Sequence, residues 1–224
     1  MAIRQRAIQA EDKQERYNAI LDATERVLQR SPDRVANVAE VADEASLAKG
    51  TVYLYFPGKE ELLLALHERN IEGFFAALTA ALESPRPVAI DEVLDLTHRY
   101  MLDPPLFLPL AVRCLAHMGQ AVSPEAGAAF RERLAARLER AGAGLQRHFP
   151  DLPRGGGVVL LRHSYALILG LWQLSGADAC PAGNAAPGGP LHDWSFPENL
   201  DAALRALWQG TLVAHRPGSS GSAP

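Results

Sequence analysis

Residues 37–60, NVAEVADEASLAKGTVYLYFPGKE, predict two short helices joined by a tight turn. The first helix lies near 37–44, where Asn37 is a favoured N-cap residue and Glu40 follows three positions later, as in a capping box. The second helix lies near 49–55. Two short helices with a turn of three or four residues are typical of a helix-turn-helix, whose second helix fits the major groove of DNA.

The second predicted helix divides into an inner and an outer face. Val52 and Phe56 are spaced to pack inward. The side chains expected to face outward are Lys49, Thr51, Tyr53 and Tyr55. The alternative to a binding role is a half-buried structural position for each tyrosine and a solvated surface position for each lysine.

The rest of the chain also has helical patterns. Apolar residues recur with helical spacing from Glu11 to about Arg30, and a long helix follows Gly58. Further helical patterns fall at roughly 88–101, 105–120, 124–148, 157–178 and 197–214. Because convincing strand alternation is absent, we predict an all-α fold. We expect a helix-turn-helix DNA-binding domain at 1–57, a helical ligand-binding and dimerisation domain at 58–215, a loop at 180–191 and a disordered tail at 216–224.

Composition limits the class of protein. The chain has 224 residues, 48% of them hydrophobic and 21% charged, which is ordinary for a globular protein. No window approaches the roughly 20 uninterrupted apolar residues of a membrane span, and no secretory signal opens the chain. We therefore expect a cytoplasmic protein without a membrane partner. Residues 1–70 hold ten Lys and Arg against twelve Asp and Glu, so affinity for DNA must come from where the cations lie.

The stretch AKGTVYLYFPGKEELLLAL closely resembles the N-terminal signature of the TetR family of bacterial transcriptional regulators. The resemblance is specific over about residues 11–66, and beyond residue 70 only the helical architecture matches. It implies that Lys49, Gly50 and Thr51 approach base edges and that hydroxyls and amines nearby bind phosphates. The DNA-binding residues that we expect are Asn37, Lys49, Gly50, Thr51, Tyr53, Tyr55 and Lys59.

Three positions depart from the family pattern. Ser46 stands where the turn usually has Gly, so it must accept a positive φ or the chain must use another turn. Ala48 replaces the usual capping Ser of the second helix and removes a cap worth about 1 kcal/mol. Asn37 replaces a capping Thr, which is conservative for capping. These departures bear on the rigidity of the motif and on the operator sequence.

The resemblance also implies a pocket for a small-molecule effector in the C-terminal half. Its expected lining is Phe75, Tyr100, Phe107, Arg113, His117, Phe130, Tyr165 and Trp172. An ordinary core or surface position is the alternative for each of them. Cys114 and His117 share a helix face, but no third metal ligand and no oriented base accompany them. Cys114 and Cys180 also form no disulfide framework, and we expect no metal, no cofactor and no catalytic residue.

The last two predicted helices are the expected surface of a homodimer. The faces proposed for it are Val158, Leu161, Tyr165, Ile168, Leu169 and Trp172 on one helix and Leu200, Ala203, Leu204, Leu207, Trp208 and Leu212 on the other. A two-fold dimer implies a palindromic double-stranded DNA operator, released when the effector binds. Two alternatives remain: a helical ligand-binding or interaction protein that has lost specific DNA binding, and a helical enzyme that uses Cys114 and His117.

Overall fold

The computed structural model describes residues 2–31, 36–117, 121–175 and 195–214. Within these ranges every regular element is helical, which confirms the predicted all-α fold. The helices are α1 (Ala2–Arg30), α2 (Val38–Glu44), α3 (Lys49–Tyr55), α4 (Lys59–Glu83), α5 (Ile90–Thr97), the π-helical turn η1 (His98–Leu102), α6 (Phe107–His117), α7 (Pro124–His148), α8 (Gly156–Leu174) and α9 (Phe196–Ala214). The predicted loop at 180–191 and the predicted tail at 216–224 lie outside the described residues.

The chain folds as two compact units. Unit 1 comprises Met1–Asn70 and Pro104–Ala129, and unit 2 comprises Ile71–Asp103 and Phe130–Pro224. Helix α4 is continuous through Asn70, so its first part belongs to unit 1 and its last part to unit 2. The functional boundary after residue 57 stays a prediction.

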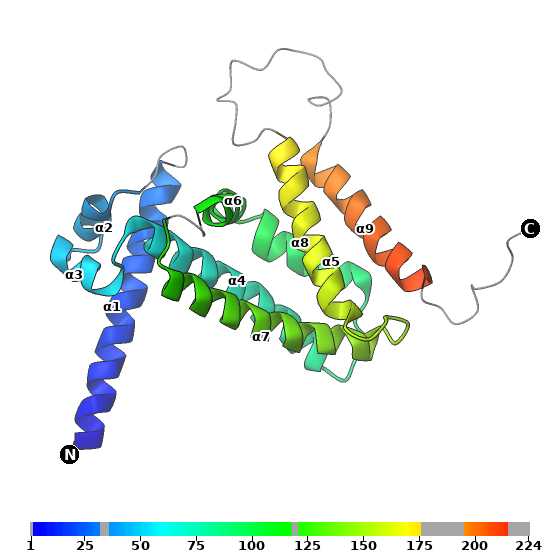
Figure 1. Cartoon of the computed structure of the whole chain (residues 1–224), viewed down its shortest axis with the longest axis horizontal. Coiled ribbons are helices and arrows are strands. Elements are labelled where there is room, and N and C mark those ends of the chain that lie inside the picture. The colour runs from blue at the N-terminus through cyan, green and yellow to red at the C-terminus, as the bar shows by residue number, and fades with distance from the viewer. Residues whose placement is uncertain (1, 32–35, 118–120, 176–194, 215–224) are drawn as a thin grey trace, which may run out of the picture. The chain divides into compact units, whose positions relative to one another are not determined.

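Unit 1 packs α1, α2, α3, the start of α4 and α6 around one apolar core. Figure 1 shows α2 and α3 lying beside α1. The core includes Ile20, Leu21, Val27, Val41, Ala42, Val52, Phe56, Leu62, Leu66 and Leu110. Phe56 directly follows α3, and the other side chains come from the apolar stripes of their helices, so α1 and α4 cover the inner face of the helix-turn-helix.

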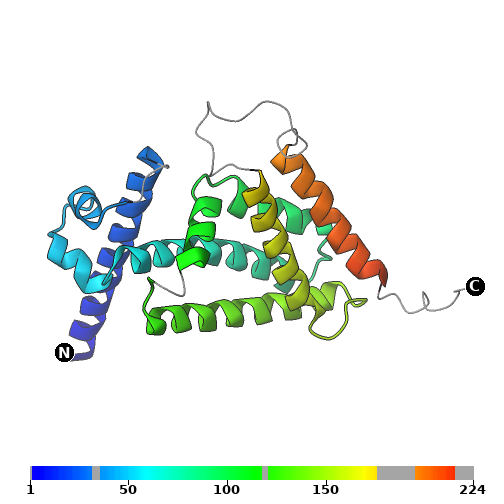
Figure 2. The same cartoon turned by 45° about the horizontal axis from the view of Figure 1, so that its top comes forward.

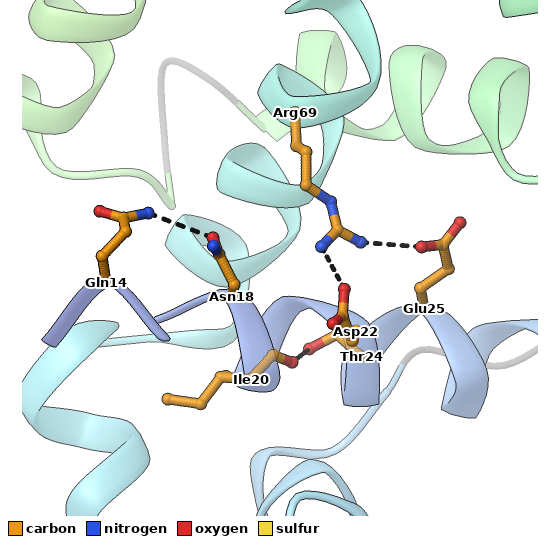
Figure 3. Close-up of polar contacts among 7 residues, drawn as sticks. All are labelled: Gln14, Asn18, Ile20, Asp22, Thr24, Glu25 and Arg69. Carbon is orange, nitrogen blue, oxygen red and sulfur yellow. Dashed lines mark hydrogen bonds and ion pairs between the residues drawn. The ribbon is translucent and has the colours of Figure 1, made fainter. Parts of the chain in front are cut away.

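Ion pairs hold α1 against its neighbours at the rim of that core. The Arg69 guanidinium of α4 donates to Asp22 and, at 2.7 Å, to Glu25, both on α1 (Figure 3). Arg26 and Arg30 of α1 both donate to the Glu44 carboxylate at the end of α2. The two hydrogen bonds lower the pKa of Glu44, and the bond from Arg30 has the larger effect. Exposed pairs of this kind stabilise a fold only weakly.

In unit 2, α8 and α9 run side by side, as Figure 2 shows, and α5 packs against α9. The Trp208 indole N–H donates to the Ser164 hydroxyl at 2.9 Å and so joins α9 to α8. Helices α7 and α8 approach closely at Gly142 and Gly157. A Cβ on Gly157 would lie 2.2 Å from the Gly142 carbonyl oxygen, so this crossing requires glycine.

The proposed dimer faces need a correction. Six of the residues assigned to them are buried within the single chain: Leu161, Ile168, Leu169, Leu200, Leu204 and Trp208. The helical period identified the apolar face of each helix, but it does not say which element covers that face. By length and composition alone, α8 is apolar enough to cross a membrane, and 33% of its most apolar window is buried in the chain.

Candidate DNA-binding interface

The start of α2 is held by the predicted capping box. The Asn37 side-chain oxygen accepts from the backbone N–H of Ala39 at 3.0 Å, and the Glu40 carboxylate accepts from the backbone N–H of Asn37. Both bonds satisfy amides that a helix N-terminus leaves without a partner. The amide group of Asn37 is thereby fixed at the surface at one edge of the motif.

The turn between α2 and α3 closes α2 with a Schellman motif. The Leu47 N–H donates to the Ala42 carbonyl at 2.9 Å, and the Ser46 N–H donates to the Asp43 carbonyl at 3.1 Å. Ser46 has φ of 55° and therefore occupies the left-handed position where glycine is preferred. Leu47 packs against the core of unit 1. The turn thus keeps its geometry although Ser46 departs from the family pattern.

Helix α3 begins without a side-chain cap, as the sequence predicted. Ala48 is in an extended conformation with φ of −67° and ψ of 139°, and no side-chain bond caps the helix. Val52 and Phe56 are buried, as expected, whereas Lys49 and Tyr53 are exposed. The ammonium of Lys49 lies 5.8 Å from the centroid of the Tyr53 ring, a cation–π distance.

Tyr55 and Thr51 are less exposed than the outward positions assigned to them. Tyr55 is half-buried and packs against the core of unit 1, and Thr51 is also half-buried. The ring of Tyr55 therefore has the half-buried structural position that was the alternative to a binding role. A phosphate contact by its hydroxyl stays a prediction.

A surface hollow of about 420 Å³ brings several of the predicted residues together. Asn37 lines it from the start of α2, Tyr53 from α3, and Lys59 from the start of α4. The remaining lining residues are Ala36, Val38, Pro57 and Gly58. The N-terminus of α4 carries unsatisfied amide N–H groups and the positive end of the helix dipole, so the hollow suits an anion.

Two acidic residues in the first turn of α4 are directed into other contacts. The side chain of Glu60 is only 11% exposed and accepts from Arg113 of α6 at 3.2 Å. Glu61 accepts from the backbone N–H of Ser123 at 3.1 Å. Both acids also lie close to the hollow, since Glu60 Oε1 is 3.9 Å from the Lys59 ammonium and a Cβ on Gly58 would lie 2.7 Å from Glu61 Oε2. Lys59 is the more exposed partner of its pair with Glu60, with 54% of its side chain accessible against 11%.

Sequence reasoning missed one exposed residue of α3. Leu54 is 85% exposed, the highest value among the large exposed apolar side chains of the described residues. Its position, two residues after the buried Val52, turns it about 200° around the helix and therefore away from the core. The helical spacing between Val52 and Leu54 is the sequence signal that identifies this exposed position, but the predicted outer face included only polar residues.

The predicted effector-pocket residues fall in both units. Phe107 and Arg113 belong to unit 1, and Phe75, Tyr100, Phe130, Tyr165 and Trp172 belong to unit 2. The side chain of His117 lies outside the described part of the chain. Phe107 is fully buried with its ring centroid 5.3 Å from that of His67, and Trp172 stacks edge-to-face on Phe196 at 5.2 Å. Both rings therefore have packing partners, and their role in a pocket stays a prediction.

Cys114 does not have the properties of a nucleophile. Burial, with the Glu60 charge as a smaller contribution, raises the pKa of its thiol to about 12. A nucleophilic cysteine needs the opposite shift, since the thiolate is the reactive form. Among the described residues no group of three or more potential ligands could hold a metal ion.

Comparison with known proteins assigns both parts of the chain. Residues 20–66 match the family described as bacterial regulatory proteins of the tetR family. Residues 68–215 match a family described as the tetracyclin repressor-like C-terminal domain. The second match alone covers more than half of the chain.

Individual relatives agree with this assignment. The chain is 34% identical over 62 residues to the fatty acid metabolism regulator protein of Bacillus subtilis (strain 168), a match that covers 28% of this chain and 32% of that protein. It is 35% identical over 68 residues to an uncharacterised HTH-type transcriptional regulator of Haemophilus influenzae, covering 30% of this chain and 36% of that protein. The chain thus matches about a third of the length of these relatives.

Two solved structures share the fold over most of the chain. A putative TetR-family regulator from Mesorhizobium loti superposes with a TM-score of 0.59 at 16% identity, covering 89% of this chain and 96% of that one. The TetR family regulator PfmR from Thermus thermophilus gives a TM-score of 0.51 at 21% identity, covering 85% and 97%. Taken with the two family matches, this places the chain in the TetR family of transcriptional regulators.

Proposed function

We propose that this protein is a homodimeric, cytoplasmic repressor that binds a palindromic DNA operator and is released by a small-molecule effector. Residues 1–57 form the DNA-binding domain, and residues 58–215 bind the effector and form the dimer. The protein uses no cofactor and catalyses no reaction. The observation that carries the proposal is the hollow lined by Asn37, Tyr53 and Lys59.

The hollow is suited to one phosphate of the DNA backbone. Lys59 supplies a charge, Tyr53 a hydroxyl and the start of α4 its free amides, and these are the groups that commonly bind phosphate oxygens. The side-chain oxygen of Asn37 accepts the capping hydrogen bond of α2, so its NH₂ group remains as a donor for the phosphate. A phosphate held here fixes the orientation of α3 without reading sequence.

Base recognition falls to the first turn of α3. Lys49, Gly50 and Thr51 begin this helix, and no side chain caps its N-terminus. A helix of this size enters the major groove, roughly 12 Å wide, with its first residues nearest the base edges. Tyr55 is the weakest member of the predicted set, because its ring is part of the core of unit 1.

The dimer surface is the part of α8 and α9 that the single chain leaves uncovered. On α8, Val159, Ala166 and Leu174 are exposed, and Gly170 has open space where a Cβ would lie. On α9, the exposed apolar residues at helical spacing are Ala202, Ala206 and Val213. Small and aliphatic side chains let two helices approach closely. This stripe therefore replaces the buried residues that sequence reasoning assigned to the dimer.

The continuity of α4 supports release by the effector. This helix starts at Lys59 beside the hollow and continues without a break to Glu83 in unit 2. An effector that binds unit 2 more tightly when α4 is tilted would favour the tilted state. The tilt would change the distance between the two α3 helices of the dimer and so weaken operator binding. The coupling needed is a differential affinity of typically about 1–3 kcal/mol.

The test is selection from randomised duplex DNA with the purified full chain. We expect enrichment of a palindrome whose half-site centres lie about 34–36 Å apart, with affinity that falls steeply with salt. The selected duplex then serves to screen small molecules for release. A folded protein that enriches no sequence at low salt would refute operator binding and favour the ligand-binding alternative.

Variants in the hollow separate phosphate binding from folding. Asn37→Asp keeps an N-cap of equal strength but places a negative charge beside the phosphate. We expect it to unfold like the wild type and to bind all duplexes about fivefold more weakly, because two like charges about 4 Å apart in water repel by about 1 kcal/mol. Lys59→Gln should also weaken binding uniformly and reduce the salt slope. Arg131→Gln, which removes an equal charge from an exposed site on α7, is the matched control.

A further inference from the structure

The outer side of helix α3 carries a large apolar side chain. Leu54 is 85% exposed, and it lies opposite Val52, which is fully buried. Gly50 and Thr51 precede Leu54 by four and three residues, so they occupy the same side of the helix one turn earlier. The predicted base-contacting residues and the exposed leucine therefore form one continuous surface.

Gly50 is not required by the fold. A Cβ at this position would meet nothing within 4 Å, and its backbone does not need positive φ. Glycine inside a helix costs about 1 kcal/mol relative to alanine, so its presence is unfavourable for folding. A glycine without a packing reason, on the same side of the helix as the exposed leucine, indicates a surface that another molecule approaches closely.

We propose that Leu54 makes an apolar contact with the C5-methyl group of a thymine in the major groove, once in each operator half-site. The inference rests on the proposed function and adds to it the identity of one recognised base. Among the groups that base pairs display in the major groove, this methyl is the apolar one. The donors and acceptors that the bases display there would lose a hydrogen-bond partner beside a leucine, and the C–H edges offer it less apolar surface than a methyl does.

The neighbouring side chains favour DNA as the occupant of this surface. Lys49 and Tyr53 lie beside this surface, within cation–π distance of each other, and Lys59 lies at the hollow that Tyr53 also lines. An apolar side chain bordered by cations and a phenol hydroxyl fits a polyanion that presents a methyl group. Half-buried Thr51 lies one turn before Leu54 on the same side of the helix.

The test measures how tightly the protein binds its selected operator when each thymine is replaced by deoxyuridine, a deoxyuridine scan. Each thymine is replaced in turn, in both half-sites, by deoxyuridine, which keeps every hydrogen-bonding group and removes only the methyl. For the wild type we expect one thymine per half-site whose replacement weakens binding about fourfold per contact. For Leu54→Ala we expect weaker binding to the thymine operator and no further loss on replacement, because the two changes remove one contact.

Leu115→Ala is the matched control. Leu115 is also an exposed leucine of unit 1, but it lies on α6, so its truncation should leave the deoxyuridine scan unchanged. Leu54→Gln gives a second readout, since glutamine favours adenine. Selection repeated with this variant should change the preferred base at that one position of each half-site and nowhere else.

The outcomes separate the inference from the function beneath it. A wild-type protein that binds its operator but tolerates every deoxyuridine overturns the thymine contact and leaves the repressor proposal standing. Equal losses in wild type and Leu54→Ala also overturn it, because another residue would then read the methyl. Failure of the folded wild type to select any operator overturns the proposed function, and the thymine contact with it.

Discussion

Replacing Ala48 by Ser should stabilise the protein by supplying the missing cap of α3. The backbone at Ala48 already has φ of −67° and ψ of 139°, the extended geometry of an N-cap residue. The Ala48 carbonyl accepts from the Thr51 N–H at 2.8 Å, so the first turn of α3 is formed. Ala48 is exposed, so a serine hydroxyl at this position would stay accessible to water and would not pay a desolvation cost when it caps the helix.

The magnitude follows from these three conditions. Because no backbone movement, steric conflict or desolvation opposes the new bond, we expect the full value of a cap, about 1 kcal/mol. That gain corresponds to an increase of about 2–4 °C in Tm for a chain of this size. Urea unfolding followed by circular dichroism at 222 nm should show a higher midpoint at an unchanged slope. Amide exchange at Gly50 should also slow, since its N–H is the one that the hydroxyl would bind.

Ala128→Ser is the matched control. Ala128 is also exposed and lies in unit 1, but it is inside α7, where serine lacks a cap to make and has a lower helix propensity than alanine. This variant should lose about 0.5 kcal/mol. If Ala48→Ser is neutral, or destabilises as Ala128→Ser does, the uncapped start of α3 is not a weakness of the fold and the reasoning is refuted.

Three further predictions concern buried or strained residues. Ser46→Gly should raise the free energy of unfolding by about 0.5–1 kcal/mol, because glycine tolerates φ of 55°; Ser46→Val should lower it in the same urea titration. Burial lowers the pKa of His67 to about 4. The unfolded chain therefore binds the extra proton as pH falls, and the contribution of His67 to stability should drop by about 2 kcal/mol from pH 7 to pH 5. His67→Leu should remove this contribution and leave the weaker pH dependence of paired carboxylates such as Glu44. In a Cys180→Ser variant, Cys114 should react with a thiol reagent at pH 8 only after unfolding.

The local features of the helix-turn-helix could be predicted because each depends on residues close in sequence. The capping box of Asn37 and Glu40 and the uncapped start of α3 appear in the structure as predicted. At Ser46 the chain adopts a positive φ, which was one of the two alternatives that the sequence left open. Caps and turns involve backbone groups within a few residues, so the identity of the side chain decides them. The buried positions of Val52 and Phe56 follow from the helical period in the same way.

Features that depend on neighbouring helices were predicted less well. Tyr55 was expected to face outward, but α3 packs so that its ring joins the core of unit 1. Leu161, Ile168 and Trp208 were assigned to a dimer, but they pack within the chain. In each case the period identifies an apolar face, while the element that covers it comes from a distant part of the sequence.

The all-α class, the helix-turn-helix and the family were all predictable from the amino-acid sequence. Its signals are local: periodic apolar residues, caps and a turn, each read from a few adjacent positions. That Asn37, Tyr53 and Lys59 line one hollow depends on how the helices pack, because the three residues belong to three different elements. Helix packing also decides which apolar residues stay uncovered, Leu54 on α3 and Val159 on α8 among them. Burial is a property of packing between segments far apart in the chain, and no local pattern contains it.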